Sequence, residues 1–174
     1  MVIRKTKPPL AVQIRSMRHE DIPVVVSIER LCFGDRWSAA AFATELENPS
    51  STYLVAVHGD QIMGYAGFWL ILEEAHITTI AVHPTEQGQK IGEQLLLGLI
   101  DESARHGAKW MTLEVRISNV VAQKLYEKYG FSALGKRRGY YQDDGEDALV
   151  MWTENIWQDA YHTRLAALKA SLQS

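Results

Sequence analysis

The spacing of apolar positions divides the chain into predicted strands and helices. Short runs rich in β-branched and aromatic residues predict strands, whereas apolar residues three or four positions apart predict helices. We expect strands at 11–17, 52–58, 61–70, 74–82, 109–116, 131–141 and 148–153. We expect helices at 21–33, 39–47, 89–106, 119–129 and 155–173. Because strands and helices do not alternate throughout, this order predicts a mixed α/β fold with an antiparallel start, and not a doubly wound dinucleotide fold.

Capping residues and glycines mark the predicted helix ends. Pro23 suits the first turn of the first helix, and Ser38 and Ser118 are expected to cap the second and fourth helices. Gly107 and Gly130 follow the third and fourth helices, where glycine commonly ends a helix. The boundaries are therefore expected close to these residues.

The length of 174 residues fits one domain with short appendages. Residues 1–10 are basic, and no apolar stretch of a secretory signal follows them, so we expect a flexible tail. Residues 11–153 are expected to form the domain, and 154–174 a helical extension. Apolar residues of this extension share one helical face, which is expected to pack on the domain or, alternatively, to form a dimer contact: Trp157, Tyr161, Leu165, Leu168 and Leu172.

Composition excludes several classes of function. A net charge of −3 argues against a nucleic-acid partner, and no apolar run is long enough to cross a membrane. The single cysteine, Cys32, cannot form an internal disulfide, which favours a reducing compartment and a cytoplasmic location. His76 and His83 lie seven residues apart with no third ligand at a useful spacing, so we expect no metal site.

The loop between the 74–82 strand and the next helix carries the first candidate chemistry. His83-Pro84 is followed by the stretch Gln87 to Gly92, which opens an apolar helix. Backbone N–H groups and the helix dipole at such a start favour phosphate or pyrophosphate. The stretch matches neither the nucleoside-triphosphate P-loop nor the dinucleotide GxGxxG pattern.

This stretch resembles the acetyl-CoA loop of the GNAT N-acetyltransferase superfamily, whose pattern is Gln/Arg-x-x-Gly-x-Gly/Ala. Gln87 and Gly92 match, whereas Lys90 replaces the central glycine. A lysine side chain can crowd a pyrophosphate, but its N–H is retained and its ammonium can pair with phosphate. We therefore expect acetyl-CoA to bind as a co-substrate.

A second group of motifs resembles the RimI-type branch, the ribosomal-protein alanine N-acetyltransferases, over about 13–152. These motifs are Leu113–Arg116, Ser118-Asn119, Leu125-Tyr126, Gly130-Phe131 and the hairpin stretch from Arg137 to Ala148. The resemblance implies a GNAT fold with a mostly antiparallel sheet flanked by helices, here with an added C-terminal helix. It also implies direct transfer of acetyl from acetyl-CoA to a protein N-terminus, namely the N-terminal alanine of the eighteenth small-subunit ribosomal protein. Broader N-terminal, lysine or small-amine specificity remains an alternative, as does a non-catalytic CoA-binding protein.

The reaction needs a group that deprotonates the amine and a group that protonates the departing thiolate. The resemblance implies Glu114 as the proton acceptor, and an alternative is a structural glutamate paired with Arg116 or Lys109. It implies Tyr126 as the proton donor, and an alternative is an ordinary buried aromatic residue.

The resemblance also implies two sets of binding residues. Expected contacts with acetyl-CoA come from a strand end, the loop and two helix starts: Ile80, Ala81, Val82, Gln87, Gly88, Gln89, Lys90, Ile91, Gly92 and Asn119. Expected contacts with the peptide come from the first two helices, the 74–82 strand and the last hairpin: Phe33, Trp37, His76, Arg138, Tyr140 and Tyr141. Arg137 and Arg138 are expected to steer an acidic peptide, or else to be a solvated face of the hairpin.

Overall fold

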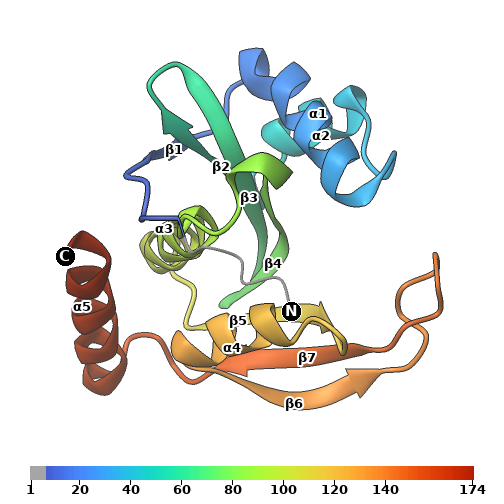
Figure 1. The fold of residues 1–174 in the computed structure, drawn as a ribbon. Helices are drawn as coiled ribbons and strands as arrows, with labels where there is room; N and C mark the ends of the chain where they lie inside the picture. The colour runs from blue at the N-terminus through green and yellow to red at the C-terminus, as the bar shows by residue number, and fades with distance from the viewer. Residues whose placement is uncertain (1–6) are drawn as a thin grey trace. The chain divides into compact units, whose positions relative to one another are not determined.

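The structure, a computed structural model, describes residues 7–174. Its strands, labelled in Figure 1, are β1 (Gln13–Ser16), β2 (Ser51–His58), β3 (Gln61–Ile71), β4 (Glu74–Val82), β5 (Trp110–Arg116), β6 (Phe131–Arg137) and β7 (Ala148–Thr153). Its α-helices are α1 (Ile22–Phe33), α2 (Ala39–Glu47), α3 (Ile91–Arg105), α4 (Val120–Lys128) and α5 (Asp159–Gln173). Short 3-10 turns cover His19–Asp21 and Pro84–Glu86. The predicted order of strands and helices is confirmed.

The strands form a mixed sheet in the order β1-β2-β3-β4-β5-β7-β6. β1 pairs antiparallel with β2, and β2 with β3. β5 and β6 each pair antiparallel with β7, while β4 pairs in parallel with β5 over Glu74–His76. The expected mixed, mostly antiparallel sheet is therefore present.

Two helix starts differ from the sequence prediction for local reasons. α3 begins at Ile91, two residues later than expected, because Lys90 has a left-handed backbone with φ 62°. Asn119, and not Ser118, caps α4, since its Oδ1 accepts the N–H of Ala122 at 3.1 Å. The N–H of Ser118 is donated instead to Glu146 at 2.8 Å.

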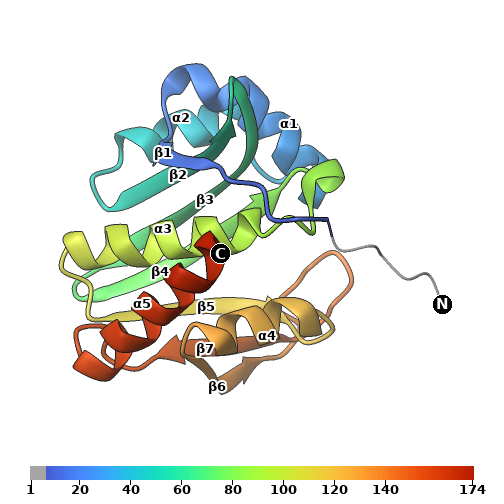
Figure 2. The same ribbon diagram turned by 60° about the vertical axis from the view of Figure 1, so that its left-hand side comes forward.

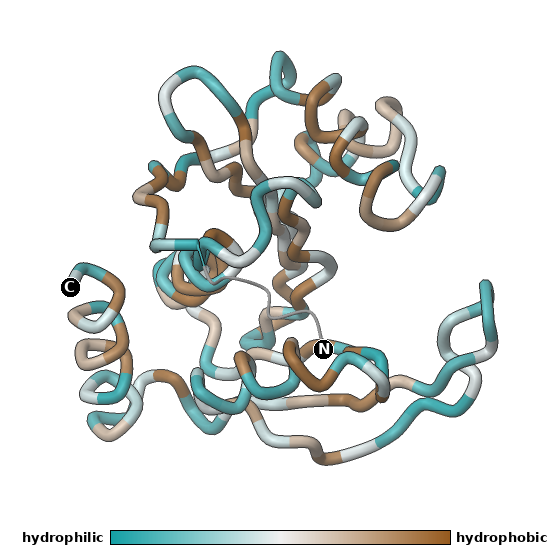
Figure 3. Tube along the Cα trace, viewed as in Figure 1, coloured by the Kyte–Doolittle hydropathy of each residue, from teal (hydrophilic) through white to brown (hydrophobic). Residues whose placement is uncertain are grey.

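The end of β6 and the start of α5 also differ from the sequence prediction. β6 ends at Arg137 instead of residue 141, and a hydrophilic loop follows it (Figure 3). α5 begins at Asp159 instead of residue 155, so Trp157 precedes the helix on which it was expected. The Trp157 indole N–H is donated to the carbonyl of Ala108 at 2.7 Å, which fixes the approach to α5.

The described residues divide into two compact units, of which the first contains the chain up to Trp69 and Ile77–Glu102. Its core lies between α1, α2 and the strands β2 and β3, where Val25, Phe42 and Tyr65 are almost fully buried. Trp37 packs against this core, with its ring centroid 5.3 Å from that of Phe42. The Trp37 ring expected to line a peptide site therefore makes its described contacts within an aromatic cluster.

The second unit contains Leu70–His76 and Ser103–Ser174. Its core includes Met111, Leu113 and Met151 from β5 and β7, and α4 packs beside β6 (Figures 1 and 2). α5 buries Tyr161 and Leu165, and the Tyr161 hydroxyl donates to the carbonyl of Tyr129 at 2.9 Å. The C-terminal helix therefore packs on the domain, as one of the two alternatives predicted.

Gly130 is required at the end of α4. Its φ is 88°, and a β-carbon there would lie 2.8 Å from the Tyr161 ring. A larger residue would therefore both strain the backbone at this position and push the Tyr161 ring of α5 away.

Residues 1–6 of the expected tail lie outside the described residues, whereas Lys7 Nζ donates to the Thr85 carbonyl at 2.9 Å and Leu10 N to Gln89 O at 3.1 Å. Within residues 7–174, no helix combines the length and apolar character needed to cross a membrane.

Candidate active site

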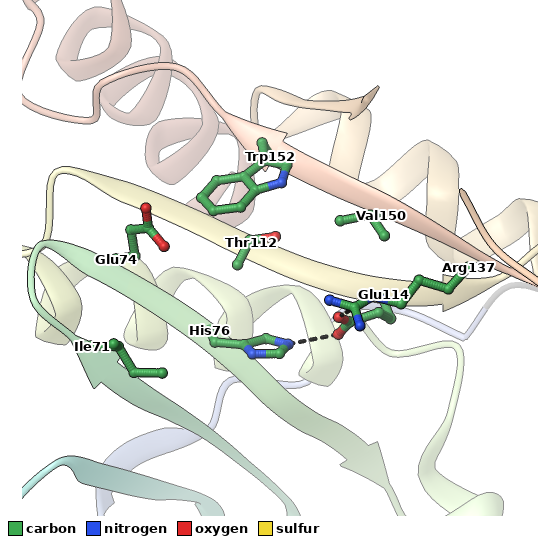
Figure 4. Close-up of a pocket in the computed structure, with 8 residues that line it drawn as sticks. All are labelled: Ile71, Glu74, His76, Thr112, Glu114, Arg137, Val150 and Trp152. Atoms are coloured by element: carbon green, nitrogen blue, oxygen red, sulfur yellow. Dashed lines mark hydrogen bonds and ion pairs between the residues drawn. The ribbon is translucent and has the colours of Figure 1, made fainter. Parts of the chain in front are cut away.

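A cavity of about 160 Å³ opens on one face of the strands in the second unit. Alternate residues of β4, β5 and β7 share this face, because side chains along a strand alternate between its two sides. The register places His76 opposite Thr112, Thr112 opposite Trp152, and Glu114 opposite Val150. The lining residues, shown in Figure 4, are Ile71, Glu74, His76, Thr112, Glu114, Arg137, Val150 and Trp152.

Glu114 is the most enclosed carboxylate of this cavity, with a side chain only 8% exposed. Its Oε2 lies 2.6 Å from His76 Nε2, and its Oε1 lies 3.3 Å from Arg137 Nε (Figure 4). An ionised carboxylate only accepts hydrogen bonds, so His76 Nε2 carries the hydrogen in this pair. His76 and Glu114 therefore meet in the lining of this cavity.

The pKa of Glu114 is set by opposing effects. Burial acts to raise the pKa, but the hydrogen bond from His76 and the charges of His76 and Arg137 lower it by more. The pKa of Glu114 therefore lies below its ordinary value, and the carboxylate is ionised at neutral pH. An ionised carboxylate beside an open cavity can accept a proton from an amine.

The alternative pairing of Glu114 with Arg116 or Lys109 is wrong. Lys109 Nζ pairs with Glu73 at 2.9 Å. Arg116 pairs instead with the loop between β6 and β7, through Asp143 at 2.9 Å and Asp144 at 3.0 Å. Glu114 is thus held by neighbours that the linear sequence does not place beside it.

Arg116 organises the loop that carries two expected peptide contacts. Its guanidinium carbon lies 3.9 Å from the centre of the Tyr141 ring, and the Tyr140 ring stands edge-on to Tyr141 at 5.1 Å. Arg116 also pairs with Glu146 at 3.1 Å. Tyr140 is 42% exposed, and Arg138 beside it is exposed as well. The loop therefore presents an aromatic side chain while being fixed to β5.

Tyr126 lies on α4, where its ring centroid is 5.8 Å from that of Phe131. Burial, with a smaller contribution from Tyr141, raises the pKa of Tyr126 to about 12. The phenol is therefore neutral at neutral pH, as a proton donor must be. Tyr126 is not among the residues that line the cavity around Glu114, and its catalytic role stays a prediction.

In the first unit, the stretch before α3 has the backbone of an anion-binding loop. Gly88 and Lys90 have φ values of 84° and 62°, and α3 then starts at Ile91. Left-handed residues that precede a helix turn successive N–H groups toward one side, and the first-turn N–H groups of a helix have no partner within it. The backbone from Gly88 to Gly92 therefore suits the diphosphate of acetyl-CoA.

Side chains of the same loop tie it to the end of β4. Gln87 Nε2 donates to the Val82 carbonyl at 3.2 Å, and Gln89 Nε2 donates to Glu86 Oε2 at 2.8 Å. The Val82 carbonyl also accepts the thiol of Cys32 at 3.3 Å, and burial raises the pKa of that thiol. Gln87 and Gln89 thus shape the loop, and Cys32 is not an activated nucleophile.

The remaining expected contacts are distributed over both units. Ile80 and Ala81 lie on β4 beside Val82, with Ala81 buried, and Phe33 ends α1 with 40% of its surface exposed. Asn119 of the second unit uses its side chain as the cap of α4. In residues 7–174, no group of three or more potential metal-ligating side chains occurs.

Sequence reasoning missed five residues that line the cavity, namely Ile71, Glu74, Thr112, Val150 and Trp152. Two of them can be found from the alternation of side chains along a strand, counted from His76 and Glu114, which were singled out from the sequence. Glu74 is two residues from His76, and Thr112 is two from Glu114. Val150 and Trp152 follow only once the register of β7 against β5 is known.

Comparison with known proteins gives the class of this protein. Residues 22–131 match the acetyltransferase (GNAT) family. The chain belongs to this family, and the membership predicted from the loop and strand motifs is confirmed.

Named relatives place the chain more closely within the family. The ribosomal protein bS18-alanine N-acetyltransferase of Escherichia coli (strain K12) is 36% identical over 140 residues, 79% of this chain and 94% of that protein. The N-alpha-acetyltransferase RimI of Mycobacterium tuberculosis is 41% identical over 121 residues, 67% of this chain and 75% of that protein. The crystal structure of the Escherichia coli ribosomal-protein-S18-alanine N-acetyltransferase is similar with a TM-score of 0.75 at 34% identity, covering 82% of this chain and 93% of that one.

Proposed function

We propose that this chain transfers an acetyl group from acetyl-CoA to the N-terminal amine of a protein, with the N-terminal alanine of ribosomal protein bS18 as its main substrate. The observation that carries the proposal is the ionised, almost buried Glu114, held by His76 and Arg137 at an open cavity. The N-terminal acetylation for which the Escherichia coli and Mycobacterium tuberculosis relatives are named supports the same reaction.

Glu114 is proposed to accept the proton of the incoming ammonium. A free α-amino group has a pKa near 8, so a carboxylate acting directly or through a water is a sufficient base. His76 and Arg137 keep Glu114 ionised. The imidazole of His76 is more exposed to solvent than the Glu114 carboxylate that it contacts. The uncharged amine can then attack a thioester carbonyl.

Acetyl-CoA supplies the activated acetyl group, and we propose which residues of this chain contact its diphosphate, its pantetheine arm and its thiolate. The backbone N–H groups from Gly88 to Gly92, that of Lys90 included, are proposed to hold the diphosphate. Ile80, Ala81 and Val82 are proposed to hold the pantetheine arm. Tyr126, whose pKa is about 12, is proposed to give its phenolic proton to the departing thiolate.

In the second unit, the peptide is proposed to contact Tyr140 and Tyr141. Tyr140 is 42% exposed, and Arg116 holds Tyr141 in place. A ribosomal protein as substrate, together with the lone cysteine, also supports a cytoplasmic location.

A peptide panel tests the function. Peptides that differ only in the first residue, with an internal-lysine peptide whose N-terminus is blocked as the control, are incubated with the purified protein and acetyl-CoA. We expect acetylation of the N-terminal amine with preference for Ala and Ser. Acetylation of the internal lysine alone would replace this function with lysine acetylation, and acetyl-CoA binding without any transfer would leave a non-catalytic CoA-binding protein.

A further inference from the structure

We propose that Glu74 and Trp152 form a subsite for a basic side chain at the second or third position of the acceptor peptide. This inference rests on the proposed function, because it takes the acceptor amine to lie at Glu114. It adds a preference beyond the first residue, and it concerns the end of the cavity that the transfer itself does not use.

The charge balance of the cavity favours a cation. Its formally charged lining residues are Glu74, Glu114 and Arg137. Arg137 is engaged by Glu114 at 3.3 Å. Glu74 is exposed, and in residues 7–174 it has no ion-pair partner. The uncompensated charge of the cavity is therefore the Glu74 carboxylate.

The arrangement along the strands places this charge away from the transfer chemistry. Glu74 lies two residues before His76 on the same face of β4, a separation of about 6.6 Å along the strand. Figure 4 shows Glu74 and Trp152 toward one end of the cavity, with Glu114 and Arg137 toward the other. An extended peptide advances about 3.4 Å per residue, so an amine at Glu114 brings its next two residues within side-chain reach of Glu74.

Trp152 adds an aromatic face to this carboxylate. It stands opposite Thr112 in the register of β5 and β7 and lines the cavity. The aliphatic stem of an arginine or lysine can lie on the indole while its charged end reaches a carboxylate, which is a common way to bind such side chains. The pair therefore fits a basic residue better than an apolar or acidic one.

This differs from one of the two alternatives predicted for the hairpin. Arg137 and Arg138 were expected to steer an acidic peptide or to form a solvated face, and the Arg137 guanidinium is bound to Glu114 at the opposite end of the cavity. An acidic residue near Glu74 would meet like charge. The preference inferred here is therefore for basic peptides.

The test compares Glu74→Gln with Glu73→Gln. Glu73 is the adjacent carboxylate, it pairs with Lys109 and does not line the cavity, so the two variants change the net charge equally. The peptides begin with Ala and carry Arg, Gln or Glu at position 2, or the same three residues at position 3. The readouts are kcat and KM for each peptide.

We expect the unchanged protein to favour the Arg peptide over the Gln peptide by about five- to thirtyfold in kcat/KM, mainly through KM. Glu74→Gln should reduce this ratio below about threefold with kcat retained, and Glu73→Gln should leave it unchanged. Glu74→Lys should favour the Glu peptide. A ratio near one in the unchanged protein, or equal effects of the two Gln variants, would overturn the subsite while leaving N-terminal acetylation standing. Failure to acetylate any of the peptides would instead contradict the proposed function.

Discussion

His76 Nε2 lies 2.6 Å from Glu114 Oε2, and this contact joins β4 to β5 in the lining of the cavity. A buried carboxylate alone would tend to hold its proton. The imidazole, together with Arg137, reverses this tendency and lowers the pKa of Glu114. The pair thus provides a base that is ready at neutral pH.

Removing His76 should move the pH dependence of the reaction. In His76→Ala, the pKa of Glu114 rises because burial is no longer offset by the hydrogen bond, so the acidic limb of the kcat/KM profile should shift to higher pH. His58→Ala, at an exposed histidine bonded to the Ala11 carbonyl, is the matched control and should not shift it. An unchanged profile in His76→Ala would mean that His76 does not tune Glu114.

Lys90 should be a strained position in the loop. Its φ of 62° is accessible to glycine at little cost, so Lys90→Gly is expected to raise the free energy of unfolding by up to about 1 kcal/mol. Lys90→Ala keeps the β-carbon and should not gain this stability. Urea unfolding of the three proteins measures the difference.

The same pair of variants separates backbone from charge in acetyl-CoA binding. Calorimetry should give Lys90→Gly an affinity equal to or tighter than that of the unchanged protein. Equal and large weakening in both variants would show that the Lys90 ammonium is a phosphate ligand and that its side chain is not merely tolerated.

Glu29 should make stability depend on pH. Its side chain is buried in α1 and accepts a hydrogen bond from the Tyr65 hydroxyl. Burial raises the pKa of Glu29 to about 7, and the charge of Arg36 acts in the opposite direction. The folded chain therefore retains this proton between about pH 4.5, the ordinary value, and about pH 7, whereas the unfolded chain releases it. Because the folded state binds more protons in this window, the free energy of unfolding should fall as the pH rises through it and then level off.

Glu29→Gln removes this dependence. At pH 8 it should be more stable than the unchanged protein by about 2–3 kcal/mol, and at pH 4 by little, as followed by urea unfolding at both values. Glu20→Gln, at an exposed carboxylate, should change stability by less than about 0.5 kcal/mol at either pH. Parallel unfolding curves for Glu29→Gln and the unchanged protein would contradict a protonated Glu29.

Arg116 should support the peptide side of the site. Arg116→Gln releases Asp143, Asp144 and the Tyr141 ring, so the KM for an Ala-starting peptide should rise about three- to tenfold while the affinity for acetyl-CoA stays the same. Trypsin should also cleave after Arg138 faster. Arg116→Lys should restore part of the KM, and an equal loss of acetyl-CoA affinity would point to general unfolding instead.

Much of the fold could be predicted because local signals were strong. The mostly apolar, β-branched run of 74–82 predicted β4 with the bounds that the structure has, and Ser38 caps α2 through the Ala41 N–H as expected. The start of α3 was missed because a lysine gives no local sign of a left-handed backbone, which glycine would have given. Trp157 matched the helical spacing of α5 but is held outside the helix by its bond to Ala108.

The site was predictable in its parts but not in its connections. Glu114 and His76 could be singled out by motif and residue type. Their contact depends on the parallel register of β4 and β5, which pairs residues 36 positions apart. This register brings His76 beside Glu114, which lies 38 positions further along the chain. The partner of Arg116 similarly depends on how the loop after β6 folds back, and the linear spacing of Glu114 and Arg116 suggested the wrong pair.

The most direct test measures acetylation of an Ala-starting peptide by the unchanged protein and by Glu114→Gln, with mass spectrometry to locate the acetyl group. We expect the unchanged protein to modify the N-terminal amine, and Glu114→Gln to lower kcat about 10²- to 10⁴-fold at constant acetyl-CoA affinity. Equal turnover by the two proteins at neutral pH would contradict Glu114 as the base.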